Sequence, residues 1–190
     1  MIGASMTRII GGAVGGRQLV VPTGRSTRPT SDRAREGLFN TLSTCVDLSG
    51  ARVADLYAGS GAVGLEALSR GASHVLLVDH GPAAVRALRR NVAALGLAGA
   101  EIVQASVSRV VQNTSSDPYE VIFLDPPYAM SDIELREVLA RLHGGAWLAV
   151  DGVCVVERSH RSGPVTWPDG LCALRDRRYG EGVLWYGIRS

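Results

Sequence analysis

Apolar residues follow two alternating patterns over most of the chain: short continuous runs, and segments with helical spacing. Short runs are typical of buried strands, and recurrence at every third or fourth position is typical of amphipathic helices. Strands alternating with helices predict an α/β fold whose parallel sheet is covered on both faces. The predicted strands are 52–57, 74–79, 101–104, 120–124 and 153–157, and the predicted helices are 62–70, 82–95, 106–112 and 131–142.

Both ends of the chain depart from this alternation. Residues 8–12 and 16–21 predict two short strands around a glycine-rich turn, before a loop at 22–29 and a helix that ends near residue 42. Strands predicted at 173–178 and 183–188 are joined by Tyr-Gly-Glu-Gly, which is typical of a hairpin. We therefore expect an antiparallel edge on the sheet.

The composition fits one globular domain and removes several kinds of chemistry. The chain has 190 residues, 46% hydrophobic and 20% charged. It contains no apolar run of the roughly 18 residues that span a bilayer. Its three cysteines and four histidines lack metal-ligand spacing, so we expect no metal and a reducing, cytoplasmic location. All 20 basic residues are arginine, which excludes a Walker-A lysine, a Schiff-base lysine and a lysine general base.

Positive charge gathers near the N-terminus, although the formal net charge is only +2. Residues 7–40 hold six arginines and two acidic residues, a net of +4, and the remaining residues have a net of −2. A basic segment beside a near-neutral domain predicts an edge that faces a polyanion such as nucleic acid. Chance clustering on a solvated surface is the alternative.

A glycine-rich turn follows the strand at 52–57. Gly59, Gly61 and Gly64 match G-x-G-x-x-G, which brings backbone N–H groups close to a ligand at a helix N-terminus. Asp79 ends the next strand, where its carboxylate can accept both hydroxyls of a ribose. The pattern predicts a binding site for an adenosine-bearing cofactor, and the residues that flank the motif are predicted to contact it as well. These are Tyr57, Ser60 and His80.

Two cofactors fit this turn. A nicotinamide dinucleotide requires room for a pyrophosphate. S-adenosylmethionine instead carries an ammonium and a sulfonium, which favour an acidic neighbour such as Asp55 at the strand end. The glycine turn alone does not separate the two.

A second motif decides between them. The apolar run at 121–124 delivers Asp125 to the carboxyl edge of the sheet, where open α/β sheets bind ligands. Pro126 and Pro127 fix the backbone and remove two N–H donors, so carbonyl acceptors are expected to face outward. Asp125 and one such carbonyl can accept both hydrogens of a planar exocyclic amine while Tyr128 stacks on its ring.

The chemistry of such an amine explains the need for two acceptors. Its nitrogen lone pair is delocalised into the ring, which makes the amine a poor nucleophile. Acceptors that hold both hydrogens favour a pyramidal nitrogen whose lone pair points at a sulfonium methyl. Transfer is then an in-line displacement driven by positioning and nearby charge. The motif therefore predicts S-adenosylmethionine as cofactor and the set Asp125, Pro126, Pro127 and Tyr128 as catalytic.

The Asp125–Tyr128 motif after a Gly59-Ser60-Gly61 turn resembles S-adenosylmethionine-dependent methyltransferases that act on amino nitrogens. The N-terminal stretches 8–12, 16–19 and 28–40 look like those of the RsmD-type family of bacterial 16S rRNA (guanine-N2)-methyltransferases. The resemblance covers nearly the whole chain. It implies a Rossmann-like class I methyltransferase sheet of seven strands, flanked by helices, with an N-terminal β-hairpin extension.

The resemblance also implies a substrate and a division of the chain. The substrate is the guanine conventionally numbered 966 in 16S rRNA, methylated on N2 within the small ribosomal subunit or an assembly intermediate. The enzyme would be a monomer. Residues 1–6 would be a disordered or added segment, 7–30 an RNA-facing hairpin and loop, and 31–190 the methyltransferase domain.

Further residue roles follow from the same resemblance. The segment 28–33 would lie over the methionine end of the cofactor, where Thr30 or Arg33 meets its carboxylate. Many relatives of the wider class hold the adenine amine with an acid after the third strand. Here Gln104-Ala105-Ser106 stands there, so Ser106 or backbone would make that contact. The basic charge of the N-terminal segment, rather than the resemblance, assigns four residues to RNA: Arg8, Arg17, Arg25 and Arg28.

Other functions remain open. The same motif allows adenine-N6 methylation of DNA or RNA, and glutamine-N5 methylation of protein, whose enzymes usually have Asn in place of Asp125. A non-catalytic rRNA-binding assembly factor would keep the basic hairpin but give the Asp125–Tyr128 turn no purpose, and a dehydrogenase would explain neither. Cytosine-C5 methylation is disfavoured because no cysteine follows a proline, and lysine-centred ribose methylation is excluded because the chain has no lysine.

Overall fold

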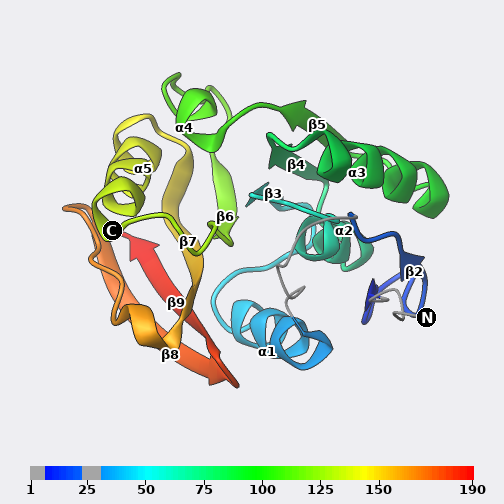
Figure 1. Ribbon diagram of the computed structural model, residues 1–190, viewed down its shortest axis with the longest axis horizontal. Helices are drawn as coiled ribbons and strands as arrows, with labels where there is room; N and C mark the ends of the chain where they lie inside the picture. Colours follow the sequence, from blue (N-terminus) through cyan, green and yellow to red (C-terminus); the bar gives the residue numbers. More distant parts are fainter. Residues whose placement is uncertain (1–6, 23–30) are drawn as a thin grey trace.

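The computed structural model describes residues 7–22 and 31–190 and confirms a mixed seven-stranded sheet in the order β5-β4-β3-β6-β7-β9-β8 (Figure 1). The strands β3 to β7 run parallel, and β9 pairs antiparallel with both β7 and β8. The carboxyl ends of the parallel strands therefore meet at one edge. The strands are β3 (Arg52–Leu56), β4 (His74–Asp79), β5 (Ala100–Gln104), β6 (Tyr119–Leu124), β7 (Leu148–Ser159), β8 (Leu171–Tyr179) and β9 (Gly182–Arg189).

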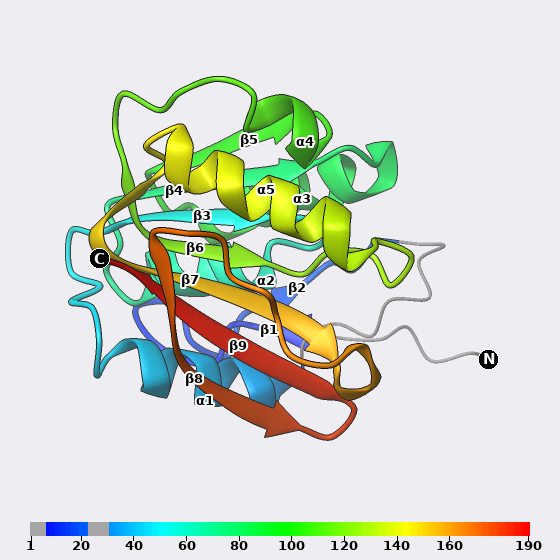
Figure 2. The same ribbon diagram turned by 90° about the vertical axis from the view of Figure 1, so that its left-hand side faces the viewer.

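Helices cover both faces of the sheet, as the alternating pattern predicts, and two separate apolar cores result. One face packs against α1, α2 and α3, and the opposite face packs against α4 and α5 (Figures 1 and 2). None of these helices has both the length and the apolar character needed to cross a bilayer, within the described ranges. The helices are α1 (Asp32–Leu42), α2 (Ala62–Ser69), α3 (Pro82–Leu95), α4 (Val107–Val110), α5 (Asp132–Gly144) and the 3₁₀ turn η1 (His160–Ser162).

The N-terminal hairpin, β1 (Thr7–Arg8) and β2 (Gln18–Leu19), is anchored to this domain. Ile9 and Leu19 are buried in the core on the α1 side of the sheet. The buried carboxylate of Glu66 in α2 accepts the N–H groups of Ile10 at 2.6 Å and Gly11 at 2.9 Å. A carboxylate removed from water requires such donors, so Glu66 fixes the hairpin against α2.

The largest departures from the predicted boundaries are in β7 and in the two N-terminal strands. β7 begins at Leu148 rather than 153. The sequence pattern misses its first part because Val150 is exposed and Asp151 has a left-handed backbone with φ 60°, which together interrupt the apolar alternation. The N-terminal strands are shorter than predicted, since Gly12 and Gly16 turn the chain with positive φ. The predictions for residues 1–6 and 23–30 lie outside the described residues.

Candidate active site

The turn between β3 and α2 has one packed side and one open side. Gly59 and Gly61 have φ of 59° and 78°, which favours glycine at both positions. A Cβ on Gly61 would lie 2.7 Å from Leu88 Cδ2, so that glycine allows close packing. A Cβ on Gly59 would find no atom nearer than the Tyr57 carbonyl oxygen at 4.0 Å. The space in front of Gly59 is therefore open to a ligand.

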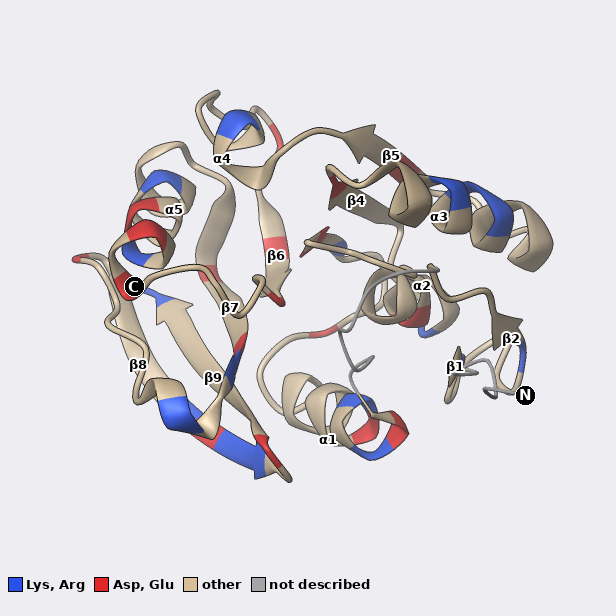
Figure 3. Ribbon diagram, viewed as in Figure 1, with Lys and Arg blue, Asp and Glu red and all other residues tan. Residues whose placement is uncertain are grey.

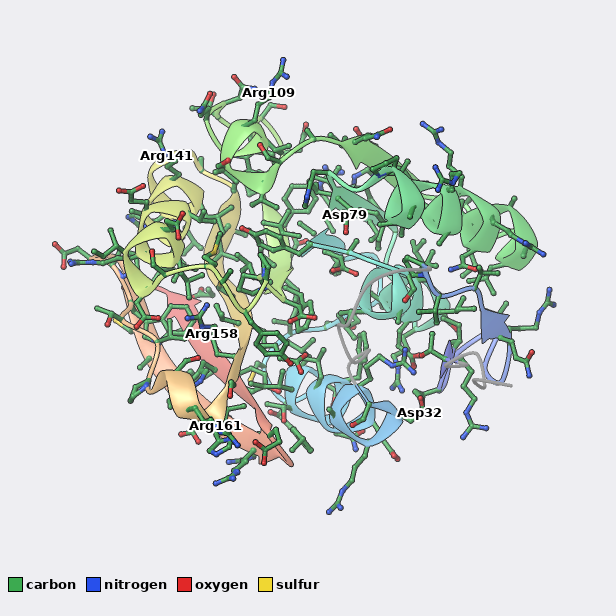
Figure 4. All side chains as sticks on the ribbon, viewed as in Figure 1. Asp32, Asp79, Arg109, Arg141, Arg158 and Arg161 are labelled. Carbon is green, nitrogen blue, oxygen red and sulfur yellow. The ribbon has the colours of Figure 1, made fainter. Side chains whose placement is uncertain are left out.

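Two carboxylates, each 2% exposed, hold this turn. Asp79 accepts the N–H of Gly59 at 3.0 Å on one oxygen and that of Gly81 at 2.8 Å on the other (Figure 4). Asp55 accepts the Gly64 N–H at 2.9 Å, which fixes the start of α2. Burial raises the pKa of Asp55 to about 7, although the Gly64 N–H opposes this change. Asp55 thus supports the turn, and its contact with a cofactor stays a prediction.

The Asp125–Tyr128 motif lies directly beside the glycine turn. Leu124 pairs with Leu56 in the register of β6 and β3, and the Asp125 N–H donates to the Leu56 carbonyl at 3.4 Å. Tyr128 is 74% exposed. The Pro127 carbonyl accepts the Met130 N–H at 2.9 Å in a tight turn. Pro126 is left as the expected source of the second acceptor.

A pocket opens between this motif and the end of β7. Because Leu124 pairs with Val156, Asp125 at the end of β6 and Glu157 in the last part of β7 occupy neighbouring positions. Glu157 is not among the residues predicted from the sequence. It follows the apolar run 153–156 as Asp125 follows 121–124, and this repeated pattern is a signal that could have identified it. The pocket is lined by Asp125, Pro126, Tyr128, Glu157, Arg158, Ser159, Ser162 and Gly182.

Arg158 and Tyr57 hold the loop that follows the motif. The Arg158 guanidinium, almost fully buried, donates to the Met130 carbonyl at 3.0 Å and to Asp132 at 2.9 Å (Figure 4). The Tyr57 hydroxyl donates to Met130 Sδ at 3.7 Å, and burial raises the pKa of Tyr57 to about 12. The loop is therefore fastened to both β7 and β3. No sequence spacing pointed to Arg158, because its partners lie 26 and 28 residues away.

The other predicted cofactor residues lie at or near the same edge of the sheet. His80 is exposed, with Nδ1 3.9 Å from an oxygen of Asp79. Ser106 is exposed at the start of α4, directly after β5, and Arg33 is exposed in the first turn of α1. Thr30 lies outside the described residues. Binding of the cofactor by these residues stays a prediction.

Two of the four arginines predicted to bind RNA are described, and both are exposed. The Arg8 Nε lies 3.1 Å from Asp32, and Arg17 donates to the Ala94 carbonyl at 2.8 Å. Figure 3 shows a second concentration of basic residues, on η1 and β8 at the far side of the sheet. Arg25 and Arg28 lie outside the described residues, and the RNA contacts stay predictions.

Comparisons with known proteins decide the family. The family model described as Conserved hypothetical protein 95 matches residues 7–188. The chain belongs to this family. One curated relative of this chain is the Ribosomal RNA small subunit methyltransferase D of Escherichia coli strain K12. It is 35% identical over 179 residues, which cover 94% of this chain and 88% of the relative. The RsmD-type resemblance is confirmed.

Solved structures confirm the class I methyltransferase fold. An Escherichia coli protein described as the methyltransferase yhhF superposes with a TM-score of 0.87 at 33% identity, over 98% of this chain and 99% of that one. The magnesium protoporphyrin IX methyltransferase of Synechocystis, solved with bound S-adenosylmethionine, superposes with a TM-score of 0.65 at 13% identity. That match covers 83% of this chain and 79% of that one, and at this identity it concerns the fold alone.

Proposed function

We propose that this protein transfers a methyl group from S-adenosylmethionine to the exocyclic N2 amine of a guanine, at the position numbered 966, in 16S rRNA. The observation that carries the proposal is the contact between β3 and β6, which sets Asp125 beside an open glycine turn. Membership of a family with a relative named for rRNA methylation supports the class of substrate. The choice of guanine N2 rests on the motif and the resemblance.

The residues around the turn fit the cofactor. Gly59 faces open space. The two backbone N–H bonds to Asp79 hold its carboxylate at the end of β4, beside the open side of the turn, where it can meet ribose hydroxyls. When bound, S-adenosylmethionine supplies an electrophilic methyl group on its sulfonium. The chain contributes orientation and charge on either side of that group.

The motif supplies three functions to the target amine. Asp125 accepts one hydrogen of the amine, and the Pro126 carbonyl accepts the other. Tyr128 stacks on the base, which its high exposure permits before RNA arrives. As the nitrogen gains the methyl it becomes a cationic ammonium, which the Asp125 carboxylate stabilises. The ammonium then loses one proton to Asp125 or to water, and a neutral secondary amine results.

Nucleoside mass spectrometry tests this proposal. The purified protein is incubated with S-adenosylmethionine and with small ribosomal subunits from cells that lack the gene, and the rRNA is then digested. We expect N2-methylguanosine to appear. N6-methyladenosine would favour the adenine alternative. RNA binding with no methylated nucleoside would favour an assembly factor without catalysis.

A further inference from the structure

The end of β7 places a second carboxylate in the pocket beside Asp125. Glu157 lies opposite Leu184 in the β7–β9 register and continues the side-chain alternation of Val155. Asp125 continues the alternation of Phe123, which packs in the same core as Val155 and Leu184. Directly paired positions in a sheet share a face. Asp125 and Glu157 therefore sit side by side on the face covered by α1, and both line the pocket.

The start of β9 leaves room for this carboxylate. A Cβ on Gly182 would lie 3.1 Å from Glu157 Oε1, closer than such atoms normally approach. A side chain at residue 182 would therefore press on the carboxylate. Gly182 at the start of β9 and Glu157 in β7 both line the pocket that Asp125 lines.

Guanine presents a run of donors that suits two adjacent carboxylates. Its N1–H and the two hydrogens on N2 lie along one edge, whereas adenine has an unprotonated N1 and offers donors only from its amine. Enzymes that act on an extruded base read this edge by hydrogen bonds. If Asp125 takes a hydrogen of the N2 amine, an acceptor alongside it can take N1–H.

We infer that Glu157 selects guanine by accepting its N1–H, and this inference rests on the proposed function. A site that accepts a hydrogen bond from this donor discriminates against an analogue that lacks it, because that bond is then not made. Glu157 is therefore a specificity residue, distinct from Asp125, which acts on the amine that reacts.

2-Aminopurine tests the inference, since it keeps the amine at C2 but has no N1–H. Small subunits are reconstituted with 16S rRNA that carries guanine or 2-aminopurine at the target position. We expect the wild type to prefer guanine by roughly 10- to 100-fold in kcat/KM, the range of one hydrogen bond to a charged group. In Glu157→Gln this preference should fall toward one, because the amide nitrogen can donate to the bare N1 of 2-aminopurine.

Two controls make the result specific. Glu181→Gln removes a nearby exposed carboxylate that pairs with Arg161 and does not line the pocket, so it should keep the wild-type preference. The Kd of each protein for the two subunit preparations is also measured without cofactor. The Kd for the 2-aminopurine subunit divided by that for the guanine subunit should be lower in Glu157→Gln than in the wild type, and unchanged in Glu181→Gln. If Glu157→Gln fails to fold, Gly182→Ala should narrow the preference by displacing the carboxylate.

The outcomes separate the inference from the proposed function. A wild type that forms N2-methylguanosine, with a Glu157→Gln variant that keeps the full preference, would overturn the role of Glu157 alone. If a folded Gly182→Ala variant kept the full preference for guanine over 2-aminopurine, this too would contradict the role of Glu157. A wild type that forms no N2-methylguanosine would overturn the proposed function itself.

Discussion

The two halves of the sheet edge are built differently. In the β3–β4 half, Asp55 and Asp79 are buried and bonded to backbone N–H groups of the glycine turn. In the β6–β7 half, Tyr128 is 74% exposed and the pocket is open beside Asp125. A geometry fixed by backbone donors holds a small ligand of constant shape. Under the proposed function the β3–β4 half is the cofactor half and the β6–β7 half is the acceptor half. The acceptor half would then be completed by the base that enters it, whereas the cofactor half is formed before the ligand arrives.

Loss of Asp125 should affect methylation strongly and cofactor binding very little, which is the largest difference expected between the two halves. We expect Asp125→Ala to reduce single-turnover methylation by about 100-fold or more, the range for losing one transition-state acceptor. Calorimetric binding of S-adenosylmethionine should stay close to that of the wild type, because the turn is held by Asp55 and Asp79. Near-normal single-turnover rates would show that Asp125 does not hold the amine.

Tyr128 tests whether the acceptor half relies on stacking. Tyr128→Ala should weaken substrate engagement by about 1–3 kcal/mol, whereas Tyr128→Phe should cost little, because the ring face is retained. The KM for small subunits measures both variants. A large rise in KM in Tyr128→Phe would show that the hydroxyl group, and not the stacked ring, contributes to substrate binding.

The same difference between the halves explains how much the sequence could predict. The Gly59 turn, Asp79 and Asp125 are tied to strand ends, and apolar periodicity locates strand ends well. The predicted bounds of β4 and α3 therefore match the structure. The family was also predictable, since its motifs are contiguous in the chain.

What could not be predicted depends on contacts between distant segments. The bond from Arg158 to Met130 joins residues 28 apart, and the turn at Pro127 is set by a backbone bond that proline content does not specify. The left-handed Asp151 hid the first part of β7. Local pattern carries no information about such contacts, which arise from tertiary packing.

Asp55 gives the cofactor half a distinctive pH dependence. Its pKa of about 7 lies above the ordinary value of 3.8, so the folded state holds the proton more tightly than the unfolded state. Stability from this group is therefore present below pH 4 and is lost as the pH rises toward 7, by at most about 1.4 kcal/mol per pH unit.

Denaturant unfolding at several pH values measures this effect. Asp55→Asn can still accept the Gly64 N–H but cannot ionise, so its free energy of unfolding should fall less than that of the wild type between about pH 5 and pH 7. Parallel curves for the two proteins would mean that Asp55 ionises in the fold as readily as in water.

The smallest expected effect concerns which half meets the RNA backbone. Arg8 and Arg17 lie on the hairpin, on the side of the cofactor half, and Arg8 already pairs with Asp32. Arg175 and Arg177 lie on β8, and Arg177 shares a register position with Leu184 and hence with Glu157. Among the described residues, no carboxylate lies within salt-bridge distance of either β8 arginine.

The salt dependence of RNA affinity distinguishes the two surfaces. Each lost phosphate contact should lower the slope of log K against log salt by about 0.7 for single-stranded RNA. We expect Arg8→Gln/Arg17→Gln to lower it by one to two such contacts, since the hairpin is rigidly anchored through Glu66 and holds its arginines in place. Arg175→Gln/Arg177→Gln is the matched pair. If only that second variant changes the slope, the RNA approaches over β8, and the acceptor half supplies both the base pocket and the path to it.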